Sequence, residues 1–166
     1  MTTKMWDLAA AEDDRRFSPY CWRAKMALAH KGLKAETIPW RFTEKEAIAV
    51  DLFNALHEKD QPYFRESREK RLGKTLEQFG AEPKQALTGL RTALLPVRKH
   101  LVQEPYVCGK TPAFADYILF GAFQWARAVS PLRLLEPDDP VYAWRERMLD
   151  LYDGLARKAK GYPVWA

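Results

Sequence analysis

The sequence predicts a mostly helical α+β fold, in which a small strand–helix–strand unit precedes an all-helical bundle. Strand-like segments occur only before residue 50, and the helix between them has clear start and stop signals. After residue 50, apolar residues recur every three or four positions, the period of an amphipathic helix. These patterns divide the 166 residues into an N-terminal part, 1–49, and a helical part, 50–166, a length that suits two small domains sharing an interface.

The N-terminal part contains two short candidate strands. Residues 5–8 alternate apolar and polar side chains, and residues 35–40 form a second segment that ends near Pro39. Two strands joined through a helix of this size normally pair in parallel. We therefore expect a parallel βαβ unit.

The helix between these strands is predicted to begin at Ser18. Serine is a favoured N-cap, Pro19 suits the first helical position, and Phe17 is spaced to pack against Trp22. Gly32 follows the apolar-periodic residues and is expected to end the helix in a glycine C-cap.

Four helices are expected after Asp60, and residues 43–56 also read as helical. Pro96 should kink the second of the four, and the third is apolar on nearly every side, which is typical of a buried central helix. The four cover residues 60–79, 83–103 and 113–129, and a segment that starts at Asp139-Pro140 and presents Trp144, Met148, Leu151 and Leu155 as one stripe.

Composition excludes several classes of function. The net charge of +5 is spread along the chain, and the densest basic cluster, 65–74, is interrupted by glutamates, so it resembles a solvated helix face rather than a nucleic-acid footprint. The longest uncharged run, 117–126, is half the length of a membrane span, about 20 residues. Two cysteines fit a reducing, cytoplasmic setting. The three histidines, at 30, 57 and 100, lack the spacing of a metal site.

The segment Ser18-Pro19-Tyr20-Cys21 is the best candidate for chemistry. The first amides of a helix lack partners and its dipole favours negative charge, so a thiolate held there has a lowered pKa. The segment matches a Cys-Pro-Tyr-Cys redox turn whose first cysteine has become serine, and it cannot cycle a dithiol. A hydroxyl at that position suits the activation of another molecule's thiol. The alternatives are that Ser18 is only a helix cap and that Cys21 is only a small buried side chain.

Further motifs surround this segment. They are Met5-Trp6-Asp7-Leu8, Phe17-Ser18-Pro19-Tyr20-Cys21-Trp22-Arg23, Lys31-Gly32, Ile38-Pro39-Trp40, Ala115-Asp116, Phe123-Gln124-Trp125-Ala126 and Leu135-Glu136-Pro137-Asp138-Asp139-Pro140. Together they resemble the glutathione S-transferase family, and most closely its bacterial and fungal group that includes the lignin β-aryl-ether-cleaving etherases. The resemblance covers about residues 5–48 and 56–165.

This resemblance implies a thioredoxin-like N-terminal domain, an all-helical C-terminal domain, glutathione as cosubstrate and, usually, a homodimer. It also implies that Ser18 stabilises the glutathione thiolate, with Tyr20 and Cys21 beside it. Arg16 is a candidate for attracting the carboxylates of glutathione, although a solvated loop explains it equally well. An apolar electrophile could lie against Tyr117, Phe120 and Trp125; the alternative for these three is ordinary core packing.

The chain departs from the family pattern in two places. After the second strand the family continues with an antiparallel strand pair and a helix, which need roughly 30 residues. Residues 41–59 are too few, and the family's Val-Pro and acidic-Ser dipeptides, which contact glutathione, have no counterpart there. We therefore expect an internal deletion of the second half of the thioredoxin-like domain. In addition, Ala113 replaces the Ser or Thr cap three residues before Asp116, and Thr111 is a substitute cap.

Three hypotheses follow. In the first, a glutathione thiolate assisted by Ser18 attacks an electrophile or an aryl ether. In the second, the chain is a non-catalytic relative whose helical domain serves interaction or dimerisation. In the third, Cys21 acts as the thiol of a glutaredoxin-like redox protein.

Overall fold

The structure, a computed structural model, describes residues 3–40, 49–81 and 83–163. Strands β1 (Thr3–Leu8) and β2 (Ala35–Trp40) enclose helix α1 (Pro19–His30). The strands pair in parallel from Thr3 opposite Ala35 to Leu8 opposite Trp40, which confirms the expected βαβ unit. In the described part of the chain, the sheet consists of these two strands.

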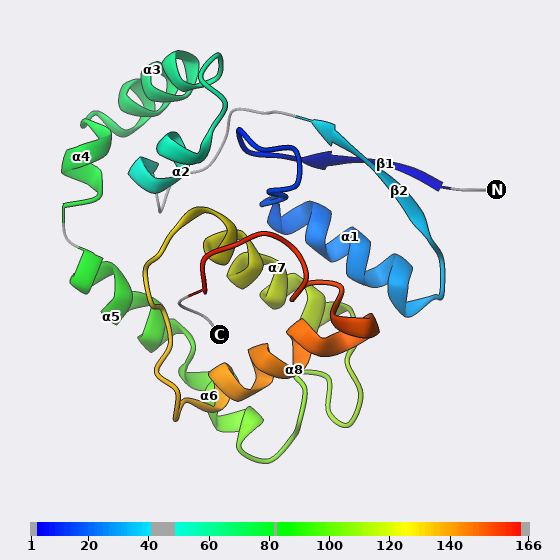
Figure 1. Ribbon diagram of the computed structural model, residues 1–166. Coiled ribbons are helices and arrows are strands. Elements are labelled where there is room, and N and C mark those ends of the chain that lie inside the picture. Colours follow the sequence, from blue (N-terminus) through cyan, green and yellow to red (C-terminus); the bar gives the residue numbers. More distant parts are fainter. Residues whose placement is uncertain (1–2, 41–48, 82, 164–166) are drawn as a thin grey trace.

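The rest of the described chain is helical, which confirms the predicted fold class (Figure 1). The helices are α2 (Ala49–Ala55), α3 (Gln61–Leu72), α4 (Leu76–Phe79), α5 (Pro83–Ala93), α6 (Leu95–Leu101), α7 (Phe114–Val129) and α8 (Pro140–Gly154). Helix α2 lies within the segment expected to be helical, whose residues 43–48 lie outside the described residues. None of the described helices is long and apolar enough to cross a bilayer.

Two of the predicted helices are each divided in two. Gly73 adopts a left-handed conformation (φ 65°) that ends α3. The prediction of a single helix over 60–79 was therefore wrong. Thr75 then caps α4 in a capping box with Gln78. The expected effect of Pro96 is confirmed as a break between α5 and α6, because proline removes one helical hydrogen bond and clashes with the preceding turn.

Helix α1 ends as the glycine signal indicates. Gly32 has a φ of 67°, and the amide of Leu33 donates to the Leu28 carbonyl over 2.9 Å. The expected packing of Phe17 on Trp22 is wrong, because the two rings lie in different clusters of the core.

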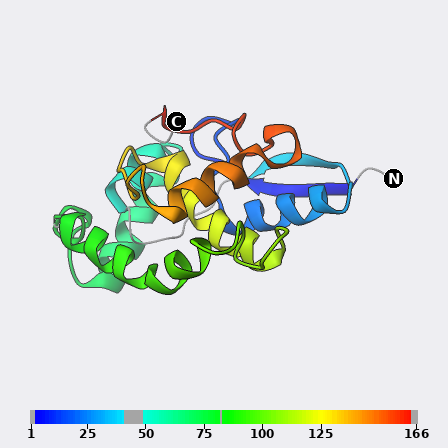
Figure 2. The ribbon, with the colours of Figure 1, turned by 90° about the horizontal axis from the view of Figure 1, so that it is seen from below.

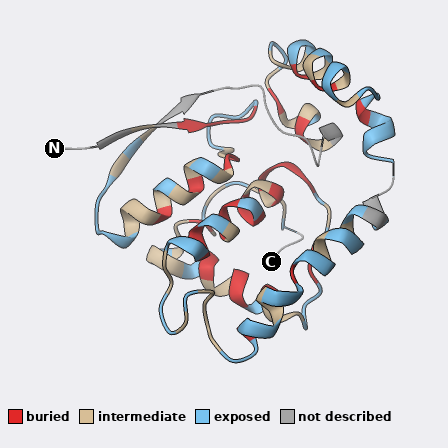
Figure 3. Cartoon of the chain, turned by 180° about the vertical axis from the view of Figure 1, so that it is seen from behind, coloured by how far each residue is buried: buried red, intermediate tan, exposed pale blue. Residues whose placement is uncertain are grey.

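The main core lies between α1, α7 and α8, with contributions from α5 and α6 (Figures 1 and 3). Trp22 and Met26 of α1 pack there with Phe120 of α7 and Trp144 of α8. A 90° turn of the view shows the sheet at one end of the molecule and α3 to α5 at the other (Figure 2). The unit before residue 49 thus shares its core with the helical bundle.

A second core cluster lies where α2, α3 and α4 meet the loop between β1 and α1. Leu52 and Phe64 pack there with Phe17 of that loop and with Ala128 and Val129 at the end of α7. Helix α7 contributes to both clusters. The loop that leads to Ser18 therefore runs between two packed regions.

The first turn of α7 is fixed by a buried carboxylate. Asp116 accepts hydrogen bonds from the amide of Ala113 (3.0 Å), the amide of Val107 (2.7 Å) and Nε1 of Trp144 (2.9 Å). Ala113 is the N-cap, so Thr111 does not replace the missing cap residue as expected. The carboxylate half of the capping box is present, and its hydroxyl half is missing because alanine has no acceptor.

Candidate functional site

Ser18 is the N-cap of α1, as the sequence predicts. Its backbone is extended (φ −63°, ψ 123°), and its Oγ accepts a hydrogen bond from the amide of Cys21 over 3.3 Å. The hydroxyl proton can still be donated to another acceptor, since a serine oxygen both accepts and donates. The residue is 6% exposed, so an anion that reaches it leaves bulk water and meets the positive end of the helix dipole.

The two residues that follow Pro19 differ in exposure. Tyr20 is 55% exposed, and the Arg23 guanidinium lies 4.6 Å from the centre of its ring. Cys21 is half-buried, packs against the second core cluster and forms no disulfide. The structure thus brings Ser18, Tyr20 and Cys21 together in one helical turn.

Arg16 points inward. Its Nη1 lies 3.4 Å from an oxygen of the Asp7 carboxylate, and its Nε donates to the Asp13 carbonyl. Trp22 Nε1 donates to the Arg16 carbonyl over 2.9 Å. The guanidinium that was expected to attract glutathione is therefore already engaged with Asp7.

Asp7 is the centre of a buried charge cluster beneath α1. Its side chain has no exposed area, and Lys25 Nζ donates to it over 2.9 Å while lying 3.7 Å from the centre of the Trp22 ring. Burial lowers the pKa of Lys25, an effect that the Asp7 carboxylate opposes. The second oxygen of Asp7 is buried and has no hydrogen-bond partner. This cluster fixes β1 to the helix that carries Ser18.

Sequence reasoning missed Asp7 as an interacting residue. The available signal was a charge between two apolar residues of a short strand, at the position whose side chain faces the covering helix. A charged residue there needs a partner, because an unpaired buried charge is costly.

Two of the three substrate-cleft candidates lie in the core. Phe120 is fully buried with its ring edge on Trp144, and Tyr117 is 2% exposed. The Tyr117 hydroxyl lies 2.7 Å from Nδ1 of His30 and also bonds to the hydroxyl of Tyr152. Burial, and then the bond to Tyr152, raise the pKa of Tyr117 well above its ordinary value. These aromatic side chains serve packing in this structure.

Trp125, the third candidate, lines an apolar pocket of about 220 Å³ between α5 and α7. Leu87 and Leu90 form the α5 side of this pocket. Of the α7 residues that line it, Ala122 and Ala126 lie on a different face of the helix from Gly121, which touches α1, whereas Trp125 is one turn from Gly121 and also packs against the second core cluster.

The described residues contain no group of three or more metal-ligating side chains that could hold a metal ion. His30 instead contacts the two tyrosines on α7 and α8. His100 lies against the Tyr106 carbonyl, at 3.2 Å.

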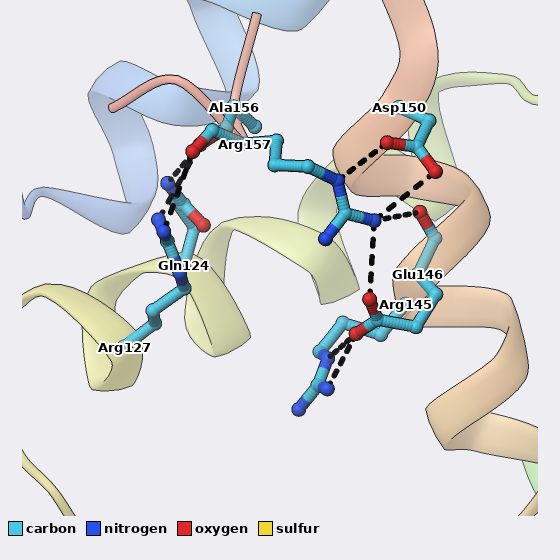
Figure 4. Close-up of polar contacts among 7 residues, drawn as sticks. All are labelled: Gln124, Arg127, Arg145, Glu146, Asp150, Ala156 and Arg157. Carbon is cyan, nitrogen blue, oxygen red and sulfur yellow. Dashed lines mark hydrogen bonds and ion pairs between the residues drawn. The ribbon is translucent and has the colours of Figure 1, made fainter. Parts of the chain in front are cut away.

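The chain returns to the Ser18 loop after α8. Arg127 and Gln124 of α7 both donate to the Ala156 carbonyl (Figure 4). Arg127 also donates to the Ala159 carbonyl. The following segment contacts the loop before Ser18, because Lys160 pairs with Glu12 and the Tyr162 ring lies under the Arg15 guanidinium.

Comparison with known proteins agrees with this architecture. A family model described as "Glutathione S-transferase, C-terminal domain" matches residues 45–136, more than half of the chain. The fold is similar to that of glutathione transferase GSTFuA3 from Phanerochaete chrysosporium, with a TM-score of 0.66 and 18% identity over 93% of this chain and 92% of that one. It is also similar to that of the glutathione S-transferase CsGST63524 of Ceriporiopsis subvermispora, solved in complex with glutathione, with a TM-score of 0.66 and 15% identity over 95% and 94% of the two chains. With a parallel βαβ unit, a helical bundle and a family match over most of that bundle, this chain belongs to the glutathione S-transferase family.

Proposed function

We propose that this chain binds glutathione at the N-terminus of α1 and promotes attack of its thiolate on an electrophilic carbon, such as that of an aryl ether. The observation that carries the proposal is Ser18, an N-cap whose hydroxyl retains a proton to donate beside the first turn of a helix. The glutathione complex of the Ceriporiopsis subvermispora protein supports the same ligand for this chain.

In this reaction the glutathione sulfur forms a bond to carbon, and the leaving group departs with the bonding electron pair and takes up a proton. Ser18 Oγ–H donates to the sulfur, and the helix dipole stabilises its negative charge. Both effects lower the pKa of the bound thiol and raise the fraction of thiolate at pH 7. Tyr20, more than half exposed in the same turn, is positioned to contact the bound molecule.

The Ser18→Ala variant tests this role. Removal of the hydroxyl should lower the turnover of a general electrophile with glutathione by about tenfold or more, and should shift the activity profile to higher pH because the thiol pKa rises. Steady-state kinetics over a pH series measures both effects. Ser67→Ala is the matched control, because the Ser67 hydroxyl donates to the Phe64 carbonyl and accepts from Arg68 Nη1, both within α3. Unchanged turnover in Ser18→Ala would refute the assignment.

A second candidate function is a non-catalytic role in which the helical domain mediates interaction or homodimerisation. It is favoured by the length of the connection, since only residues 41–48 separate β2 from α2 while a strand pair and a helix need roughly 30 residues. In this interpretation the second half of the thioredoxin-like domain is deleted, and most contacts to glutathione go with it. Calorimetric titration with millimolar glutathione separates the two functions: saturable heat excludes the second, and its absence excludes the first.

A further inference from the structure

Helix α7 touches the first turn of α1 at a glycine. A Cβ atom placed on Gly121 would lie 2.4 Å from the carbonyl oxygen of Pro19 and 3.1 Å from its carbonyl carbon. Real Cβ atoms essentially never come this close, and the obstacle is backbone, which cannot rotate away as a side chain can. Any larger residue at position 121 therefore requires the first turn of α1 to move.

The glycine has no conformational reason to be there. It lies inside a regular helix, and positive φ occurs among the glycines at 32, 73, 109 and 154 but not at Gly121. A glycine inside a helix destabilises the helix relative to alanine. The close approach of the Pro19 carbonyl accounts for it.

A second contact holds the other side of Ser18. Nη1 of Arg15 donates to the carbonyl oxygen of Ala128 over 2.8 Å, and Ala128 is fully buried. Gly121 and Ala128 are two helical turns apart, so they lie on the same face of α7. The chain is thus fixed to one face of α7 at residue 15 and at residue 19, on either side of the N-cap.

We propose that Gly121 and the Ala128 carbonyl of α7 position Ser18 for its reaction, with Gly121 as the main positioning residue. The proposal rests on the glutathione function above. An alanine at position 121 must move the Pro19 carbonyl by about 1 Å to restore ordinary contact, and a misplacement of that size can cost on the order of 100-fold in rate. The Ser18 hydroxyl and the first amides of α1 move with it.

Gly121→Ala tests the proposal, with Gly89→Ala as a matched control. Gly89 is also a helical glycine, but a Cβ atom there meets nothing within 4 Å. Thiolate absorbance across a pH titration measures the pKa of bound glutathione, and steady-state kinetics separates kcat from KM. We expect Gly121→Ala to raise the thiol pKa by about one unit and to lower kcat about tenfold or more, while the KM for glutathione changes less. Gly89→Ala should match the parent protein in all three.

A merely structural role of Gly121 predicts a different result. A variant that melts at lower temperature but retains the parent thiol pKa and kcat overturns the proposal. If Gly121→Ala does not fold, Arg15→Ala removes the second contact, and Lys160→Ala is its control because Lys160 pairs with Glu12 without reaching Ala128. An unchanged thiol pKa in Arg15→Ala would then contradict the proposal.

The unliganded protein supplies a readout that does not depend on glutathione. The amide of Cys21 is bonded to Ser18 Oγ, so hydrogen exchange at this amide reports the geometry of the cap. Faster exchange in Gly121→Ala, but not in Gly89→Ala, supports the positioning role even if the parent protein fails to bind glutathione and the proposed function is abandoned. Equal exchange rates in the two variants and the parent refute the positioning role itself.

Discussion

Single residues set the ends of the helices that carry this fold. Asp116 is fully buried and accepts hydrogen bonds from three backbone amides and from the Trp144 indole. These bonds tie the loop before α7 and the neighbouring α8 to the first turn of α7. Ala113, the N-cap, leaves the reciprocal bond of the capping box unmade. The position is extended (φ −140°, ψ −169°), as an N-cap should be.

Ala113→Ser should therefore stabilise the protein. A serine Oγ at this N-cap can accept from the Asp116 amide and complete the capping box, which is worth about 1 kcal/mol in the free energy of unfolding. Urea denaturation measures the change. Ala115→Ser, two residues further into the helix, offers no cap and should cost about 0.5 kcal/mol through lower helix propensity. Equal stabilities of the two variants would show that the cap contributes nothing.

The residue scale also shows which site residues could be predicted from the sequence. The N-cap position of Ser18 is confirmed, and it was predictable because a serine and the proline beside it are local signals. Asp7 and Gly121 were missed because their partners are distant in the sequence. Lys25, the partner of Asp7, lies on α1 rather than on the strand, and Pro19 lies about one hundred residues before Gly121. The cleft interpretation of Tyr117 and Phe120 was replaced by core packing for the same reason, since burial depends on which helix faces them.

At the scale of elements, α6 and α8 are joined by an ion pair that also caps a helix. Asp139 is the N-cap of α8 and accepts from the Val141 amide at 2.8 Å. The Arg98 guanidinium donates to both of its carboxylate oxygens, at 2.7 to 3.1 Å. Burial alone would raise the pKa of Asp139, but the hydrogen bonds from Arg98 and Val141 outweigh burial and lower that pKa.

Asp139→Asn should weaken this joint in a pH-dependent way. Asparagine keeps the cap but loses the ion pair, so we expect a loss of about 1 to 2 kcal/mol at pH 7. Because the folded-state pKa is depressed, this stability is present above the ordinary aspartate value near 4 and is lost as pH falls through the folded-state pKa. Denaturation at a series of pH values should show the parent and variant converging at low pH. Asp138→Asn, at an exposed neighbour, should change stability by less than about 0.5 kcal/mol, and a pH-independent gap for Asp139→Asn would contradict the assignment.

Most elements could be predicted from the sequence because their signals are local. The breaks at Gly73 and before Pro96 follow from the two residues that interrupt helices most strongly. Gly73 alone did not predict its break, since a single glycine in a helical pattern is tolerated; the structure shows it in the left-handed conformation that ends α3.

At the scale of the whole molecule, α7 contributes residues to both core clusters. It packs against α1 and, through Gln124 and Arg127, holds the segment that follows α8 (Figure 4). That segment in turn contacts the loop before Ser18 through Lys160 and Tyr162. The apolar character of α7 predicted its burial, but not these partners, because polar bonds between segments some 30 residues apart leave no periodic pattern.

Arg127→Met tests whether this return of the chain is held by α7. Arg127 donates to the carbonyls of Ala156 (3.4 Å), Arg157 (3.4 Å) and Ala159 (3.0 Å). Burial, followed by repulsion from neighbouring arginines, lowers its pKa from the ordinary value, so the side chain is retained there at an electrostatic cost. Methionine fills the space but removes the donor to the carbonyls of Arg157 and Ala159, while Ala156 keeps its bond from Gln124, so we expect a loss of about 1 to 3 kcal/mol.

The substitution should lower the free energy of unfolding by this amount. It should also accelerate amide exchange over residues 156–162, the segment whose Tyr162 amide donates to the backbone carbonyl of residue 127. Exchange at the Cys21 amide should increase less, because the contact between Gly121 and the Pro19 carbonyl in the first turn of α1 is retained. Arg133→Met is the matched control, since Arg133 is exposed and reaches Glu136 only at 4.0 Å, a contact worth less than about 1 kcal/mol. If exchange over residues 156–162 is the same in Arg127→Met and Arg133→Met, the segment is held by its apolar contacts alone, and the connection from α7 to the loop before Ser18 does not run through Arg127.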